Sequence, residues 1–332
     1  MNSISYGKSL TYSDIGIIPV EMSSIISRSD PDTSIDILNS SGEFITELGF
    51  PLIASPMDTV CESEMSYELD KYGMVGIIHR WMSIDKQIEE FIKTLDLILL
   101  DYNNGINIKD YHNVGFAVGI NNDWYERLSK IMDAYEAWNL EVHKNYNISS
   151  LNIAIWICFD TANGFHELMK NAILKFKESL YSRGRIVTVA GNIASYEGYK
   201  FMDSIGVDIC RVGIGGGSPC TTSVVTGIGQ GIVSTIEMCK MAKEDLEMYN
   251  NYHRSPYILA DGGIQHSGDV AKALAVGADM VMVGSLLAGF DQSPGEIVNP
   301  DEDKINILIN NLNMKESCVD IIGIGLAQSK GL

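Results

Sequence analysis

The sequence predicts an α/β protein of the (β/α)8 TIM-barrel class, folded as a single domain. Eight short apolar runs recur along the chain, segments with helical periodicity separate them, and glycine-rich turns follow the last three runs. The length of 332 residues suits a barrel, which usually needs about 250. A doubly wound open sheet is the alternative. The barrel is favoured because it lets the last three turns meet at one ligand.

The apolar runs are apolar at nearly every position, which is typical of strands buried on both faces of a parallel sheet. In chain order they cover 51–55, 74–78, 114–118, 153–159, 186–190, 208–212, 257–260 and 279–283. Helical periodicity is found over 83–98, 122–138, 166–181, 232–249 and 268–275. An N-terminal extension of about 1–49 precedes the first run. No linker or repeat marks a boundary, so one catalytic barrel over 1–332 is expected.

The composition argues against some partners and compartments. Asp and Glu number 43 against 24 Lys and Arg, a net charge of −19, whereas nucleic-acid binding relies on basic side chains. A nucleotide ligand stays open, because a few backbone amides can hold one phosphate. We find no membrane-spanning apolar stretch and no signal peptide. The six cysteines form no CxxC pair, so a reducing, cytoplasmic compartment is expected, with neither a zinc site nor a disulfide framework.

The most informative stretch follows the sixth run and covers residues 212–222, with four glycines ahead of Ser218. Glycine allows a tight turn and a close approach to a ligand. The Ser218 hydroxyl can donate to a phosphate, and the Cys220 thiol can attack an electrophilic ring carbon. Thr222 can relay a proton. The plainer alternatives are an inert loop cysteine and a threonine that only bonds within the loop.

Glycine turns also follow the last two runs, where barrel enzymes commonly bind phosphate. Asp261 and Gly263 follow the seventh run, and Gly284 and Ser285 follow the eighth. Their amides, together with a helix that begins near Ser267, predict a phosphate site. Asp261 is placed to accept hydrogen bonds from ribose hydroxyls, and its alternative role is a helix cap or turn former.

The other strand ends carry further polar groups. His79 follows the second run, and a lone histidine is more often structural than catalytic. Glu296 lies past the eighth run, where a carboxylate can bind a purine base or act as an acid or base. The plainer alternative for Glu296 is a solvated loop charge.

Taken together, these segments resemble the IMP dehydrogenase/GMP reductase family. The similarity spans most of the chain and is carried by residues 27–29, 55–60, 78–83, 190–192, the loop that ends at Cys220-Thr-Thr222, 260–264 and 267–269.

The resemblance implies a purine nucleoside monophosphate as substrate. Its phosphate would bind Ser218, Gly263, Gly284 and Ser285, and its ribose would bind Asp261. Ser55 and Met57 would belong to the same substrate site, and Cys220 would add to purine C2.

The resemblance also implies cofactors and an assembly. NADPH or NAD would exchange hydride at C2, near Asp160, Asn163 and Asn192. Carbonyl groups of Gly215, Gly217 and Cys220 match positions that bind a monovalent cation, K+, in relatives. A homotetramer is expected, because tetramers are usual in the family.

The two branches of the family catalyse different reactions, and both reactions pass through a similar covalent adduct. A dehydrogenase oxidises IMP with NAD and hydrolyses the adduct to XMP, using a mobile flap with an Arg-Tyr pair. A reductase expels ammonia from GMP and takes hydride from NADPH, using a Thr-Glu pair that would be Thr222 and Glu296 here.

Residues 56–60, Ile264 and 293–296 favour the dehydrogenase, whereas the compact chain without a regulatory insertion and residues 160–164 favour the reductase. Only 36 residues follow Glu296 and none of them forms an Arg-Tyr pair, so a shortened C-terminal region is expected. We expect a GMP reductase, because its chemistry can be assigned to residues of this chain. The alternatives are an IMP dehydrogenase, a nucleotide-binding protein without turnover and a flavin-dependent barrel.

Overall fold

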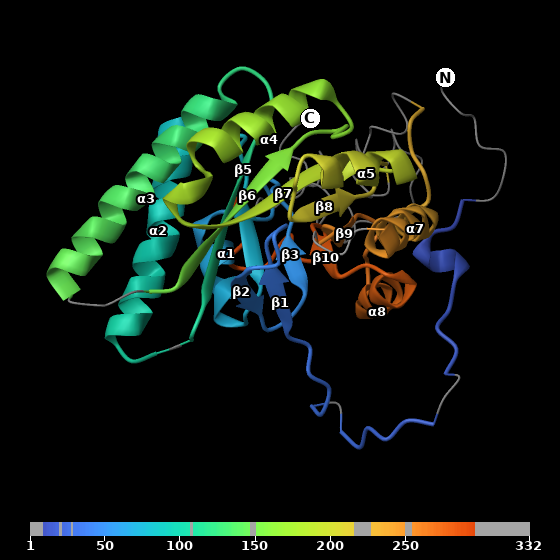
Figure 1. Ribbon diagram of the computed structural model, residues 1–332. Helices are drawn as coiled ribbons and strands as arrows, with labels where there is room; N and C mark the ends of the chain where they lie inside the picture. The colour runs from blue at the N-terminus through green and yellow to red at the C-terminus, as the bar shows by residue number, and fades with distance from the viewer. Residues whose placement is uncertain are drawn as a thin grey trace, which may run out of the picture.

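The computed structural model describes residues 9–19, 22–27, 29–106, 109–146, 151–215, 227–249 and 254–295 (Figure 1). Eight parallel strands close into a barrel in the order β10-β3-β4-β5-β6-β7-β8-β9. Helices surround the barrel (Figure 1). The predicted (β/α)8 class is therefore confirmed, and the open-sheet alternative is wrong because β10 pairs with β3.

Each predicted apolar run overlaps one barrel strand. The strands are β3 (Leu52–Ala54), β4 (Val75–Ile78), β5 (His112–Val118), β6 (Ile153–Asp160), β7 (Arg185–Ile193), β8 (Ile209–Val212), β9 (Tyr257–Asp261) and β10 (Met280–Val283). Of these, β5, β6, β7 and β9 extend beyond their runs. Residues of β6 alternate between two apolar environments: Trp156 packs inside the barrel, and Ile155 and Ile157 pack against the helices. This double burial explains why the runs are continuous rather than alternating.

The five predicted helices are present as α2 (Ile84–Asn103), α3 (Trp124–Tyr146), α4 (Glu167–Ser179), α7 (Ile232–Tyr249) and α8 (Ser267–Val276). In the described part of the chain, two further α-helices, α1 (Ser63–Lys71) and α5 (Tyr196–Ser204), were not predicted. Both are short, and several of their buried positions are polar or small, among them Ser66 and Gly198. Such positions hide the apolar periodicity that marks a helix. In the described part of the chain, no helix is long and apolar enough to cross a membrane.

The N-terminal extension contains an antiparallel hairpin, formed by β1 (Ile35–Leu38) and β2 (Phe44–Leu48), that was not predicted. Ile37, Ile45 and Leu48 are buried and join the cluster of side chains that fills the barrel interior. The hairpin therefore covers one end of the barrel core.

Hydrogen bonds show which end the hairpin covers. The Leu38 N–H donates to the hydroxyl of Tyr257 at the start of β9, over 3.2 Å. The Ser40 N–H donates to Asp208 Oδ1, just before β8, over 3.1 Å. Both partners lie at the amino ends of strands, so the hairpin closes the amino end and leaves the carboxyl end for ligands.

Asn113, which is 1% exposed on β5, joins the hairpin to the barrel core. Its Oδ1 accepts hydrogen bonds from Thr46 Oγ1 and Trp156 Nε1, both over 2.9 Å, and its Nδ2 donates to the Glu47 carbonyl over 3.0 Å. Asn113→Leu leaves two buried donors without an acceptor. We expect it to lower the free energy of unfolding by about 2–5 kcal/mol, measured by urea unfolding.

The matched control is Asn152→Leu, because the Asn152 side-chain amide makes a single bond at the surface. Its unfolding free energy should change by about 0.5 kcal/mol or less. Equal stability of the two variants would show that Asn113 does not join the hairpin to the core.

Candidate active site

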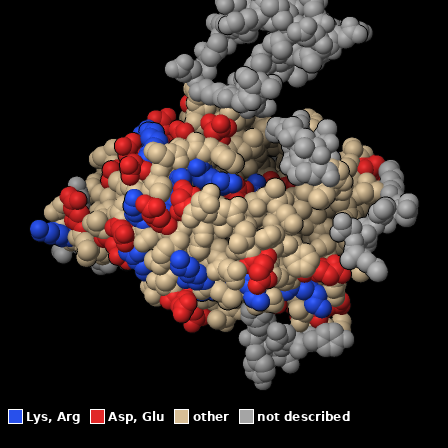
Figure 2. All heavy atoms as spheres, turned by 90° about the horizontal axis from the view of Figure 1, so that it is seen from above, with Lys and Arg blue, Asp and Glu red and all other residues tan. Residues whose placement is uncertain are grey.

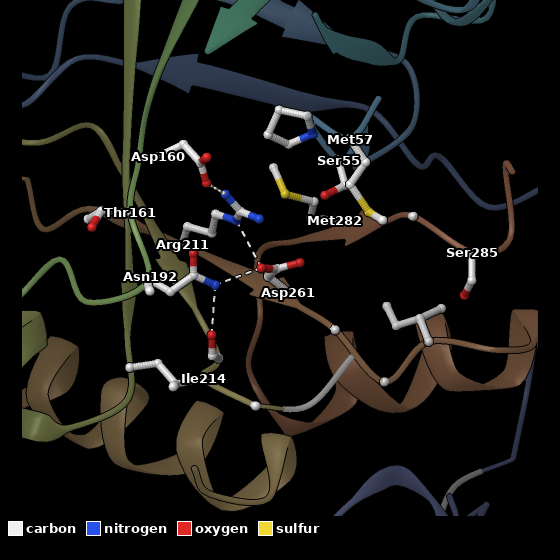
Figure 3. A pocket seen from close by; sticks show the side chains of 18 of the residues that line it. Ser55, Met57, Asp160, Thr161, Asn192, Arg211, Ile214, Asp261, Met282 and Ser285 are labelled. Carbon is white, nitrogen blue, oxygen red and sulfur yellow. Dashed lines mark hydrogen bonds and ion pairs between the residues drawn. The ribbon is translucent and has the colours of Figure 1, made fainter. Parts of the chain in front are cut away.

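A cavity of about 360 Å³ opens at the carboxyl ends of the strands (Figure 3). Nine of the predicted site residues line it: Ser55, Met57, Asp160, Asn192, Gly215, Asp261, Gly263, Gly284 and Ser285. The first and last of them, Ser55 and Ser285, are more than 200 residues apart in the sequence. Closure of the barrel brings all nine to one rim. The structure thus brings nine of the strand-end residues to one cavity, and their roles toward a ligand stay predictions.

Of the remaining predicted residues, Asn163 is the one that the structure describes, and it does not line the cavity. Asn163 is exposed, and its Oδ1 accepts the Phe165 N–H over 3.1 Å. A cofactor role for Asn163 stays a prediction. Five predicted residues lie outside the described residues: Gly217, Ser218, Cys220, Thr222 and Glu296.

The centre of the cavity wall is Arg211, which the sequence analysis missed. It lies on β8, is 8% exposed and extends between two carboxylates (Figure 3). Nη1 donates to Asp160 Oδ1 over 2.6 Å, and Nε donates to Asp261 Oδ2 over 2.9 Å. Burial disfavours the charged guanidinium, but the two carboxylates outweigh burial and raise the pKa of Arg211 above its ordinary value. Arg211 therefore stays charged and fixes both carboxylates.

Asn192 holds Asp261 from a second side (Figure 3). Its Nδ2 donates to Asp261 Oδ2 over 2.6 Å and to the Gly213 carbonyl over 2.7 Å. Arg211 and Asn192 thus use the same carboxylate oxygen, and among the described residues no hydrogen bond to Asp261 Oδ1 is found. Oδ1 is left to accept hydrogen bonds from a ligand. The alternative of a helix cap at Asp261 is wrong, because His266 is the residue that caps α8.

Glycines next to Asp261 give the cavity wall its amides. Gly263 has φ of +78°, a conformation that favours glycine. A Cβ on Gly284 would come within 2.9 Å of Met57 Sδ, so a larger residue here would require the Met57 side chain to move. Asp269 Oδ2 already accepts the N–H groups of Gln265 and His266 at the start of α8. These two amides are therefore not available to a phosphate.

His79 has a structural role, as expected for a lone histidine. It is 3% exposed, and its Nδ1 accepts the Trp81 N–H over 3.1 Å. That bond places the proton on Nε2, which lies 3.0 Å from Glu62 Oε1 and donates to it. Both ring nitrogens are engaged, so His79 positions the chain after β4.

The cysteines of the described chain are buried, as predicted for Cys158 and Cys210: Cys61, Cys158, Cys210 and Cys239. Burial raises the pKa of Cys158 to about 12, although Arg211 partly opposes the effect. Burial also raises the pKa of Cys239 to about 12. These thiols stay protonated near neutral pH and are poor nucleophiles.

Charges are mixed on the outer face shown in Figure 2. Lys and Arg lie among Asp and Glu on the described part of that face, rather than in one continuous basic area. Nucleic-acid binding uses a continuous basic stripe or patch, and this face does not provide one.

The fold and the cavity define a class: a parallel (β/α)8 barrel with a polar ligand site, rich in glycine turns, at the carboxyl ends of its strands. The description "IMP dehydrogenase / GMP reductase domain" matches residues 9–307, and the chain belongs to this family. Its members are NAD(P)-dependent oxidoreductases that bind purine nucleotides. The match favours nicotinamide chemistry over the flavin alternative.

Individual relatives divide between the two reactions. The chain is 32% identical over 326 residues to the inosine-5′-monophosphate dehydrogenase of Cryptosporidium parvum, covering 89% of this chain and 72% of the relative. It is 30% identical over 307 residues to the GMP reductase of Ascaris suum, covering 92% and 75%. An inosine-5′-monophosphate dehydrogenase of Borreliella burgdorferi is 32% identical over 326 residues, covering 87% and 72%. The chain is about equally similar to both kinds of enzyme, so sequence identity does not distinguish between the two reactions.

Proposed function

We propose that this protein is a GMP reductase that converts GMP and NADPH to IMP, ammonia and NADP+. The observation that carries the proposal is the Asp261 carboxylate. Arg211 and Asn192 fix it through one oxygen, and its other oxygen is left for ribose, beside the glycine turns of the cavity. This arrangement suits a nucleoside monophosphate, because ribose hydroxyls need an acceptor and phosphate needs amides.

The cavity also offers a surface for the base. Met57, Ile214 and Met282 line the cavity together with the polar groups, and thioether and aliphatic side chains pack well against an aromatic ring. With the phosphate at Gly263 and Ser285 and the ribose at Asp261, the purine would lie against this apolar part of the wall.

The chemistry would proceed at C2 of the purine. The Cys220 thiolate adds to C2, and the bond from C2 to the amino nitrogen breaks as Thr222 and Glu296 deliver a proton to the leaving nitrogen. NADPH, when bound, supplies a hydride to C2. The bond between C2 and the Cys220 sulfur then breaks, which returns the thiolate and releases IMP. The sum is GMP, NADPH and two protons converted to IMP, NADP+ and ammonium.

The cavity wall supports a dinucleotide next to the substrate. Asp160, Thr161 and Ala162 form one side of the cavity, and Arg80 Nε donates to Asp160 Oδ2 over 3.1 Å. With Arg211 on its other oxygen, Asp160 is held by two guanidinium groups. This side would contact the nicotinamide half of the cofactor.

The expected result of the first test is loss of NADPH absorbance when purified protein in potassium buffer receives GMP. IMP with NAD is assayed in parallel, and formation of NADH there would replace the proposal with IMP dehydrogenase. No change in either assay, with nucleotide still bound in calorimetry, would show a binding protein without turnover. Potassium-free sodium buffer serves as the cation control, because K+ at the carbonyls of Gly215, Gly217 and Cys220 belongs to the proposal.

A homotetramer in the cytoplasm completes the proposed function. Light scattering of the purified protein would measure the oligomeric state directly.

A further inference from the structure

Trp81 follows β4 and lies at the mouth of the cavity. It lines the cavity, and it is 63% exposed. Of the exposed large apolar side chains in the described part of the chain, Trp81 is the one that belongs to the cavity wall. An exposed aromatic ring at the mouth of a pocket is typical of a binding surface.

The Trp81 ring is held in place from one side. The Arg80 guanidinium carbon lies 4.2 Å from the ring centroid, and Arg80 is itself anchored to Asp160. The Trp81 backbone N–H is bonded to His79, which is buried and engaged with Glu62. Within the described residues, no second ring or cation contact to Trp81 is found. One face of the indole is thus covered by Arg80, and the ring is ordered before a ligand arrives.

The volume of the cavity indicates what approaches the other face. About 360 Å³ is near the lower limit for pockets that bind small ligands, so the cavity suits one nucleoside monophosphate. The proposed reaction needs a dinucleotide as well. The second ligand must extend from the cavity over its rim, and Trp81 is the aromatic side chain at that rim.

We propose that Trp81 is a platform on which a planar ring of the nicotinamide dinucleotide stacks, with Arg80 on the opposite face of the indole. The inference rests on the proposed function and adds a cofactor-binding residue to it. Because the ring is already ordered, stacking costs little conformational entropy. Loss of one such aromatic contact weakens binding by roughly tenfold.

The experiment titrates the full-length protein with NADP+ and follows tryptophan fluorescence and heat. Trp81→Ala should raise the Kd of NADP+ about tenfold and change the Kd of GMP less than about twofold. Trp81→Phe should keep most of the affinity for NADP+, because it keeps an aromatic face. It should lose most of the quenching of tryptophan fluorescence that NADP+ causes in the wild-type protein. The control is Trp124→Phe, since Trp124 packs beside Phe159, away from the cavity wall; it should keep both affinity and quenching.

Titration with two fragments of NADP+, nicotinamide mononucleotide and 2′,5′-ADP, identifies the ring that stacks on Trp81. If Trp81→Ala weakens nicotinamide mononucleotide, the nicotinamide ring stacks, and if it weakens 2′,5′-ADP, the adenine ring stacks. Unchanged NADP+ affinity in a folded Trp81→Ala variant overturns the inference and leaves the proposed function intact. NADP+ binding that depends on Trp81, without any turnover, supports the inference and overturns the proposed reaction. A wild-type protein that does not bind NADP+ overturns both.

Discussion

Arg211→Met is expected to lower the free energy of unfolding by about 3–5 kcal/mol and to abolish nucleotide binding. Methionine fills much of the same space but leaves Asp160 and Asp261 partly buried, close together and without their shared cation. Like charges in such a site repel, and Asp261, the proposed ribose acceptor, is then held by Asn192 alone among the described residues. Urea unfolding measures the first effect, and calorimetry with GMP measures the second.

Arg183→Met is the matched control. Arg183 also bridges two carboxylates, those of Glu136 and Asp133, but these partners are 43% and 63% exposed and lie outside the cavity. Water screens such pairs, so about 1 kcal/mol or less should be lost, with GMP binding unchanged. Equal effects of the two substitutions would mean that Arg211 is an ordinary ion-pair partner.

Cys220→Ala is expected to reduce turnover on the order of 10⁴-fold while the Kd of GMP changes little. Alanine cannot form the bond to C2, whereas the groups proposed to hold phosphate and ribose stay in place. Single-turnover absorbance measurements with NADPH report the rate. The control is Cys239→Ala, because Cys239 is buried and its raised pKa makes it a poor nucleophile.

The reactivity of the Cys220 thiol can also be measured by alkylation. The four described cysteines are buried, and burial raises their pKa values, so iodoacetamide near neutral pH should spare them. Peptide mass spectrometry then reports on Cys220, and bound GMP should protect it. Full activity of Cys220→Ala would remove the covalent mechanism.

The strands were predictable because burial on both faces makes them continuous apolar runs. The hairpin β1–β2 left a weaker signal that was overlooked. Ile35 and Ile37 flank Asp36, and Gly42, with φ of +83°, allows the chain to reverse between the two strands. Alternation followed by a glycine turn is typical of a hairpin. Helices α1 and α5 could not be found in this way, since their buried positions include polar and small residues.

The site residues could be predicted where a glycine turn or a carboxylate follows the end of a strand. Gly263 and Gly284 mark close approach, and Asp261 follows a strand end. Arg211 was missed because it lies inside an apolar run, although a charged residue in a buried strand requires carboxylate partners. Asn192 was expected near the cofactor, and that role stays a prediction. Its bond to Asp261 could not be foreseen, because it depends on how the barrel brings β7 and β9 together.

The hairpin over the amino end of the barrel has a kinetic consequence. Because side chains fill the barrel interior and β1 and β2 cover its amino end, a ligand would enter and leave at the carboxyl rim. In the proposed complex, a nucleotide at Asp261 would lie deeper than a dinucleotide stacked on Trp81 at the rim. The two ligands would therefore bind and leave in a fixed order, and the ligand that binds last would leave first. Exchange of the deep ligand would wait for the outer one, so the architecture of the barrel would impose the order of events in each catalytic cycle.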